Sequence, residues 1–158
     1  MRANRLASLI LFILLLTISR SWAQELISEL RAFAPIVNQE WIGKFDDPAE
    51  TREIFLKVEG ILNGTAIRQT QAIPAAGNFR SETLFFWDPG AKTIAYVRMT
   101  MNRYLFKGRV TPNDSVLVVE GTRYAPDGSA TPVRSELIIR HDGTFIEKGG
   151  HTILYRKK

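Results

Sequence analysis

The chain of 158 residues contains no cysteine and only two histidines. Without cysteine it can form neither a disulfide bond nor a thiolate metal site, and two histidines are too few for a structural zinc site. No Gly-x-Ser-x-Gly motif is present, and no glycine-rich phosphate-binding loop follows a strand pattern. The chain must therefore be stabilised by core packing and strand pairing, and no motif assigns it a reaction.

Long apolar runs are also missing, except near the N-terminus. Arg2 and Arg5 precede a mostly apolar run over residues 6–18, and small residues lead to Ala23. This order is typical of a secretory signal peptide, and the run is shorter than the roughly 20 residues that span a bilayer. We therefore expect residues 1–23 to be cleaved, which gives an exported, periplasmic or secreted protein without a stable membrane span. The alternative is an N-terminal membrane anchor.

After cleavage of residues 1–23, the remaining chain has no strong excess of positive or negative charge. Residues 1–23 contain three of the 21 basic residues and none of the 16 acidic ones, which leaves 18 basic and 16 acidic side chains and a net charge of +2. Because nucleic acid binding needs a basic surface, we expect no nucleic acid partner. The remaining length is enough for one domain, which we assign to residues 24–158.

The sequence does contain a change in apolar periodicity. Between Glu25 and Val37, apolar residues recur at helical spacing, and Pro35 favours an end to the helix just before it. A short amphipathic helix in this position commonly covers one end of a barrel. After Val37 the period changes to two, which is the spacing of half-buried strands.

The alternating segments are short and are separated by turn-forming residues. Such spacing is typical of an all-β sandwich or barrel, and short connections favour antiparallel neighbours whose meander closes on itself. The sequence therefore predicts an all-β fold, an antiparallel up-and-down meander β-barrel of about 8–10 strands with one short N-terminal helix capping an end. The expected strands cover residues 41–45, 52–62, 65–73, 79–87, 92–101, 104–110, 115–124, 133–140, 144–148 and 151–156.

Two turn signals lead to more specific expectations. Asn63-Gly64 suits the two positive-φ positions of a type I′ hairpin turn. Pro112 lies in the segment 111–114, which is expected to end the preceding strand at Val110.

Aromatic residues are concentrated on four consecutive expected strands. Phe85 and Trp87 share one face of their strand, and Tyr96 and Arg98 share a face of the next. If that face is interior, it forms an aromatic cavity with one cationic group, which suits an amphipathic acid. The alternative is a barrel that these side chains fill completely, because small barrels are often solid.

Single titratable side chains are further candidates for functional residues. His151 lies beside the last strand and is a haem-ligand candidate if it faces a cavity, although a lone histidine is more often a surface or hydrogen-bonded residue. We otherwise expect no metal and no cofactor. The glutamates of the expected strands are interpreted as members of exposed cross-strand ion pairs, and one that pointed inward would be an acid–base candidate. They are Glu53, Glu59, Glu82, Glu120 and Glu136.

Five short segments occur in a characteristic order: Trp41-Ile42-Gly43, Glu82-Thr83-Leu84, Trp87-Asp88-Pro89, Arg134-Ser135 and Asp142-Gly143-Thr144. In this order they resemble the calycin-like, lipocalin-like small β-barrels of bacterial exported and cytosolic proteins, whose functions are mostly unassigned. The resemblance covers roughly residues 33–155. Lipocalins carry glycine two residues before the first-strand tryptophan, where this chain has Gln39, so the looser calycin-like group is the better match.

The resemblance implies a meander barrel whose interior holds a small apolar or amphipathic ligand. In lipocalins the first-strand tryptophan packs against an arginine of a late strand, for which Arg134, Arg140 and Arg156 are the candidates here. Two other functions remain open: a solid barrel whose outer face contacts an envelope component, and a barrel isomerase or cyclase that acts on a lipid-like substrate. The candidate ligand-binding residues are Trp41, Phe85, Trp87, Tyr96 and Arg98.

The export prediction can be tested directly. A reporter fused behind residues 1–23 is expected to leave the cytoplasm, and the released protein is expected to begin at Gln24 by N-terminal sequencing. If residues 1–23 stay on the protein and hold it in the membrane fraction, they form an anchor instead.

Overall fold

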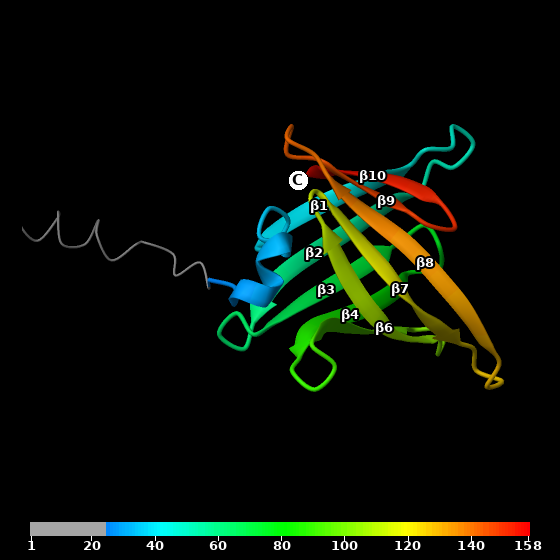
Figure 1. The fold of residues 1–158 in the computed structure, drawn as a ribbon. Helices are drawn as coiled ribbons and strands as arrows, with labels where there is room; N and C mark the ends of the chain where they lie inside the picture. The colour runs from blue at the N-terminus through cyan, green and yellow to red at the C-terminus, as the bar shows by residue number, and fades with distance from the viewer. Residues whose placement is uncertain (1–24) are drawn as a thin grey trace, which may run out of the picture.

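The protein forms one closed barrel of ten antiparallel strands, in which each strand pairs with its neighbours in sequence and β1 pairs with β10 (Figure 1). The computed structural model describes residues 25–158, so the expected signal peptide, residues 1–23, lies outside the described residues. The predicted all-β meander barrel is confirmed. Its elements are η1 (Ser28–Phe33), β1 (Gln39–Phe45), β2 (Glu53–Ile61), β3 (Ala66–Ile73), β4 (Phe79–Asp88), β5 (Thr93–Thr100), β6 (Leu105–Asn113), β7 (Val116–Tyr124), β8 (Ala130–Ile139), β9 (Phe145–Lys148) and β10 (Thr152–Lys157).

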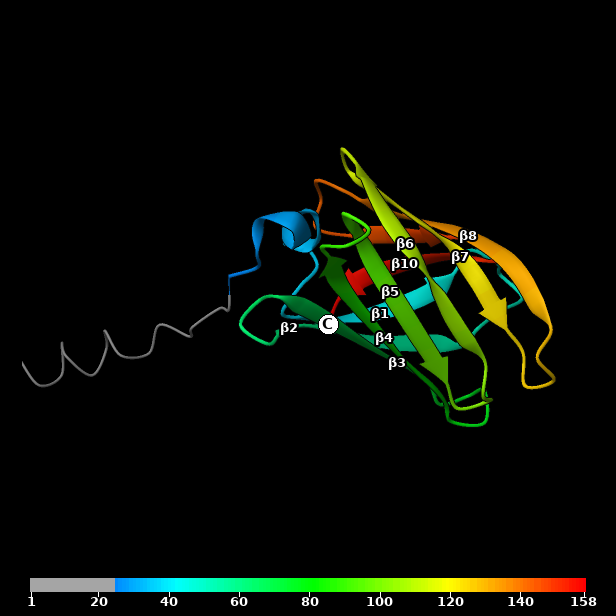
Figure 2. The same ribbon diagram turned by 60° about the horizontal axis from the view of Figure 1, so that its bottom comes forward.

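The N-terminal helix is shorter than the periodicity predicted. It is a 3-10 helix of six residues, η1, within the segment from Glu25 to Val37, and it ends before Pro35 as expected. Residues three apart lie on the same side of a 3-10 helix, so Leu30 and Phe33 both point into the barrel, where they are fully buried. The helix lies across one end of the barrel (Figures 1 and 2). No helix within residues 25–158 is long and apolar enough to cross a membrane.

Apolar side chains fill the half of the barrel next to η1, which we call the closed half. The rings of Phe33 and Phe85 pack with their centroids 4.9 Å apart. The ring of Phe145 meets Trp41 edge-on at 4.9 Å and stacks on Tyr155 at 4.4 Å. Burial of each large apolar side chain contributes about 1.5–3 kcal/mol, so this cluster supplies much of the stability of the fold.

Trp41 is held at the closed end by a hydrogen bond and by a cation. Its Nε1 donates to the backbone oxygen of Ile36 at 3.1 Å, and the Nζ of Lys157 lies 5.9 Å from its ring centroid. The resemblance implied that an arginine of a late strand packs here. The cation over the tryptophan ring is instead a lysine of β10, because β1 and β10 pair with Trp41 directly opposite Lys157.

The turn between β2 and β3 has the two predicted positive-φ residues at its centre, and the amide of Thr65 donates across them to the backbone oxygen of Leu62 at 3.2 Å. Leu62, Asn63 and Gly64 all have positive φ, between 51° and 77°. The turn is also held by a contact from elsewhere in the chain: the amide of Ile27 donates to the backbone oxygen of Gly64 at 3.1 Å. A Cβ at Gly64 would lie 2.0 Å from the backbone oxygen of Glu25, so only glycine fits.

Strand β6 continues beyond the predicted end at Val110. Pro112 lies inside the strand opposite Leu117, and the pairing continues to Asn113. Proline cannot donate a ladder hydrogen bond, but here it is one residue from the end of the strand. The loss of one donor at that point does not outweigh the pairing of the residues on either side.

Two glycines allow β6 and β7 to approach each other closely. Gly108 and Gly121 lie directly opposite each other in register, and Tyr96 is the next residue in the same row. A Cβ at Gly121 would lie 2.2 Å from the backbone oxygen of Lys107 and 2.7 Å from the hydroxyl of Tyr96. The two strands therefore approach closely because neither residue has a side chain, and the ring of Tyr96 covers the pair from the inside.

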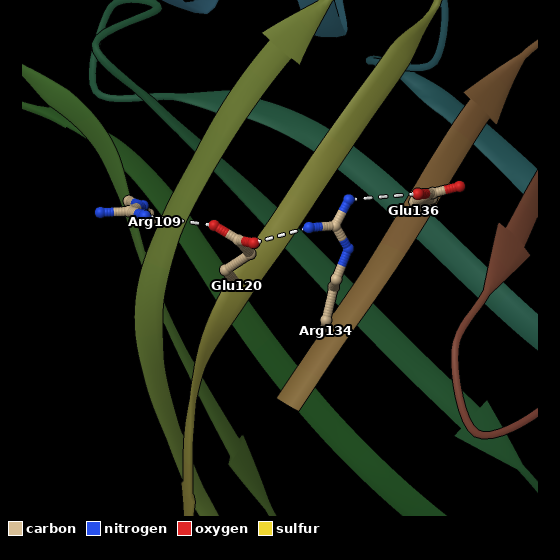
Figure 3. A network of polar contacts seen from close by, with 4 residues as sticks. All are labelled: Arg109, Glu120, Arg134 and Glu136. Atoms are coloured by element: carbon tan, nitrogen blue, oxygen red, sulfur yellow. Dashed lines mark hydrogen bonds and ion pairs between the residues drawn. The ribbon is translucent and has the colours of Figure 1, made fainter. Parts of the chain in front are cut away.

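On the outer surface of the same strands, four charged residues form a continuous ladder (Figure 3). Glu120 of β7 bridges Arg109 of β6 at 3.2 Å and Arg134 of β8 at 2.8 Å, and Arg134 also reaches Glu136 at 3.4 Å. These pairs are exposed, so each contributes well under about 1 kcal/mol. Their main effect is to favour one register across three strands.

A methyl group at the glycine pair should be costly. Gly121→Ala is expected to lower the free energy of unfolding by about 2 kcal/mol or more, because the added Cβ meets backbone atoms that cannot move aside. Urea denaturation followed by circular dichroism measures the change. Gly150→Ala is the matched control, since its Cβ would meet no atom within 4 Å. Equal stability of the two variants would contradict the proposed close approach.

Candidate functional site

The interior of the barrel is not filled uniformly. The half farther from η1, which we call the open half, contains a cavity of about 320 Å³. Small-molecule sites occupy roughly 300–1,000 Å³, so this cavity is at the lower end of that range. Its apolar wall includes Phe45, Phe79, Phe85, Tyr96, Phe106, Val119, Val133 and Ile153, and its polar wall includes Gln69, Gln71, Thr83, Arg98, Ser135, Glu147 and His151.

Three of the five residues expected to bind a ligand line this cavity. Phe85, Tyr96 and Arg98 face it from neighbouring strands, β4 and β5. Trp41 is fully buried in the closed half, and Trp87 packs against the core beside the turn that follows β4; neither is part of the cavity wall. Residues two apart on a strand share a face but lie at different levels along the barrel axis. Phe85 therefore reaches the cavity, whereas Trp87 on the same face does not.

The guanidinium of Arg98 is held from two sides. Its Nη2 donates to Oε1 of Gln71 at 2.6 Å, and its Cζ lies 5.5 Å from the ring centroid of Phe106. The same oxygen of Gln71 accepts a hydrogen bond from the hydroxyl of Ser81 at 3.1 Å. The Nε of Arg98 is buried and has no hydrogen-bond partner within residues 25–158. Arg98 therefore has a fixed orientation and one unused donor.

A carboxylate also belongs to the cavity wall. Glu147 of β9 accepts a hydrogen bond at Oε2 from the hydroxyl of Tyr155 at 3.2 Å. Burial raises the pKa of Tyr155 well above its ordinary value, and the nearby charge of Glu147 raises this pKa further, whereas Arg98 and Gln71 lower it. The phenol therefore stays protonated and acts as a donor. Within residues 25–158, no basic side chain lies within 4.0 Å of the carboxylate of Glu147.

The inward carboxylate was not among the glutamates considered from the sequence. Glu53, Glu59 and Glu120 form ion pairs on the outer surface, as expected, for example Glu59 with Arg68 at 3.0 Å. Glu147 is two residues from the buried Phe145 on the same short strand, so the period of two places both side chains on the interior face. In a strand of four residues, however, the alternation is too short to be a strong signal.

His151, the haem-ligand candidate, lies at the mouth of the cavity. It is exposed, and its ring contacts that of Phe45 edge-on at 5.6 Å. Among the described residues 25–158, no group of three or more His, Asp or Glu side chains is arranged to hold a metal ion.

A second depression lies on the outer surface of β1 to β5, where the wall of the barrel is concave. This outer groove has a volume of about 620 Å³ and is lined by Phe55, Met99 and Met101, which are 37%, 48% and 55% exposed. At one edge, Lys158 pairs with Glu40 at 3.1 Å. This surface joins outward-facing residues of five strands, so no local sequence pattern predicts it.

No protein-family model matches this chain, and no curated protein matches its sequence. The architecture itself, a closed ten-stranded antiparallel barrel, is consistent with a calycin-like fold.

The polar cluster around Gln71 should contribute to stability. Gln71→Leu is expected to lower the free energy of unfolding by about 1–3 kcal/mol, since Arg98 and Ser81 both lose their acceptor. Gln69→Leu, on the same strand and the same cavity wall, is the matched control and should cost less. Chemical denaturation compares the two, and a larger loss for Gln69→Leu would contradict this account of the cluster.

Proposed function

We propose that this protein binds or carries a small, largely apolar ligand with a polar end, in the open half of its barrel. The observation that supports this most directly is a cavity with aromatic walls that is also lined by the guanidinium of Arg98, which Gln71 and Phe106 hold in place. Apolar walls with a few fixed polar groups are the usual composition of a small-molecule site. A barrel that served only as a solid scaffold would have no need of an empty, aromatic half.

We also propose that the protein is an exported member of the calycin-like barrels. The basic and apolar pattern of residues 1–23 supports export. The meander, the capping helix and the first-strand tryptophan at the closed end support the calycin-like relationship.

The outer groove supports a second candidate function, the docking of another molecule on the outside of the barrel. Three of the five large apolar side chains that are exposed within residues 25–158 line it: Phe55, Met99 and Met101. Methionine side chains adapt to different partners, so such a surface suits an interaction site.

One experiment compares the two sites with adjacent residues. Val119 points into the cavity, whereas Val118 points outward on the same strand. Val119→Phe is expected to weaken binding of anilinonaphthalene sulfonate at least about ten-fold by filling the cavity, and Val118→Phe and Met99→Lys are expected to leave the affinity unchanged. Fluorescence titration measures the affinity, and circular dichroism checks that each variant is folded.

The opposite pattern would overturn the proposal. If Val119→Phe binds the dye as the unaltered protein does and Met99→Lys does not, the outer groove is the binding site and the cavity is not.

A further inference from the structure

Within residues 25–158, three charged residues line the cavity in the open half of the barrel, and one of them, Arg134, is paired on the outer surface with Glu120 and Glu136. The other two carry opposite charges that do not neutralise each other. Arg98 projects from β5 and Glu147 from β9, and both line the same cavity. They do not form an ion pair, since no Arg or Lys nitrogen lies within 4.0 Å of the carboxylate within residues 25–158. A ligand in this cavity therefore meets a cation on one wall and an anion on another.

A chain of neutral polar groups lies between the two charges. Arg98 donates to Gln71, and the hydroxyl of Tyr155 interacts with both Gln71 and Glu147. Because an amide and a phenol occupy the space between them, the guanidinium and the carboxylate are kept apart. Their orientations are also determined before any ligand binds, which lowers the entropic cost of binding.

Each charge has unused hydrogen-bonding capacity. A guanidinium has five N–H donors, and within residues 25–158 Arg98 donates one hydrogen bond, from Nη2 to Gln71. A carboxylate accepts at two oxygens, and Glu147 receives its hydrogen bond at Oε2. Both side chains line the cavity, so this remaining capacity is available to a ligand there.

We propose that the ligand is a zwitterionic amphiphile, with an acidic group that binds Arg98, a basic group that binds Glu147 and an apolar body against the aromatic wall. This inference rests on the proposed function, because it assumes that the cavity is the binding site. A simple fatty acid would satisfy Arg98 and be repelled by Glu147. A simple amine would be attracted by Glu147 and repelled by Arg98. In the low dielectric of a cavity these repulsions are larger than in water, so the pair of charges selects for a ligand with both.

The test uses ligands of one chain length that differ only in their polar groups. The probes are octanol, octanoate, octylamine and two zwitterions, α-aminooctanoate and ω-aminooctanoate, titrated into residues 24–158 by calorimetry. The better zwitterion is expected to bind at least about ten-fold more tightly than octanoate or octylamine. The two zwitterions differ in the distance between their charges, so their order reports the spacing that the cavity accepts.

Two neutralising variants locate the selectivity. Glu147→Gln is expected to raise the affinity for octanoate and to lower the affinity for the zwitterion. Arg98→Gln is expected to raise the affinity for octylamine and likewise to lower the affinity for the zwitterion. Glu136→Gln and Arg109→Gln remove like charges from the outer ladder and are the matched controls, with no expected change in preference.

The outcomes distinguish failure of the zwitterion inference from failure of the proposed function. If octanoate or octanol binds as tightly as either zwitterion and Glu147→Gln leaves the order unchanged, the zwitterion inference is wrong, while the cavity remains a binding site. If the folded protein binds none of the probes, both the inference and the proposed function fail.

Discussion

The pairing of β1 with β10 is the contact on which the rest of the structure depends. It joins the first strand of the sheet to the last and leaves the sheet without an edge. It also brings Gly43 so close to Tyr155 that a Cβ there would lie 2.5 Å from the ring. The polar chain of the interior draws on β3, β5, β9 and β10, so Gln71, Arg98 and Glu147 surround one space only because the barrel is closed.

Much of the fold followed from local patterns. Alternation with a period of two located all ten strands, because each strand places one face on a core and the other in solvent. The errors arose where a distant contact decided the outcome. The clearest case is Pro112, which partners across the sheet retain in its strand.

The site was predicted only in part, for a related reason. Alternation correctly grouped Phe85 with Trp87 and Tyr96 with Arg98, but it contains no information about depth along the barrel axis. Depth depends on the tilt and stagger of every strand, which are properties of the closed sheet. Glu147 shows the other limitation: its face was predictable, but its proximity to Tyr155 depends on the pairing of β9 with β10.

The two halves of the barrel differ in what holds them together. The closed half contains aromatic rings, a capping helix and a tryptophan held by a backbone hydrogen bond. The open half contains space, short side chains such as Val133 and Ser135, and a polar chain. Exchange of a short side chain beside an empty volume disturbs packing little, whereas the same exchange in the closed half creates a void or a clash. The fold thus separates the residues on which folding depends from those that line the cavity, and the shape and polarity of that cavity are free to diverge in descendants of this sequence without loss of the barrel.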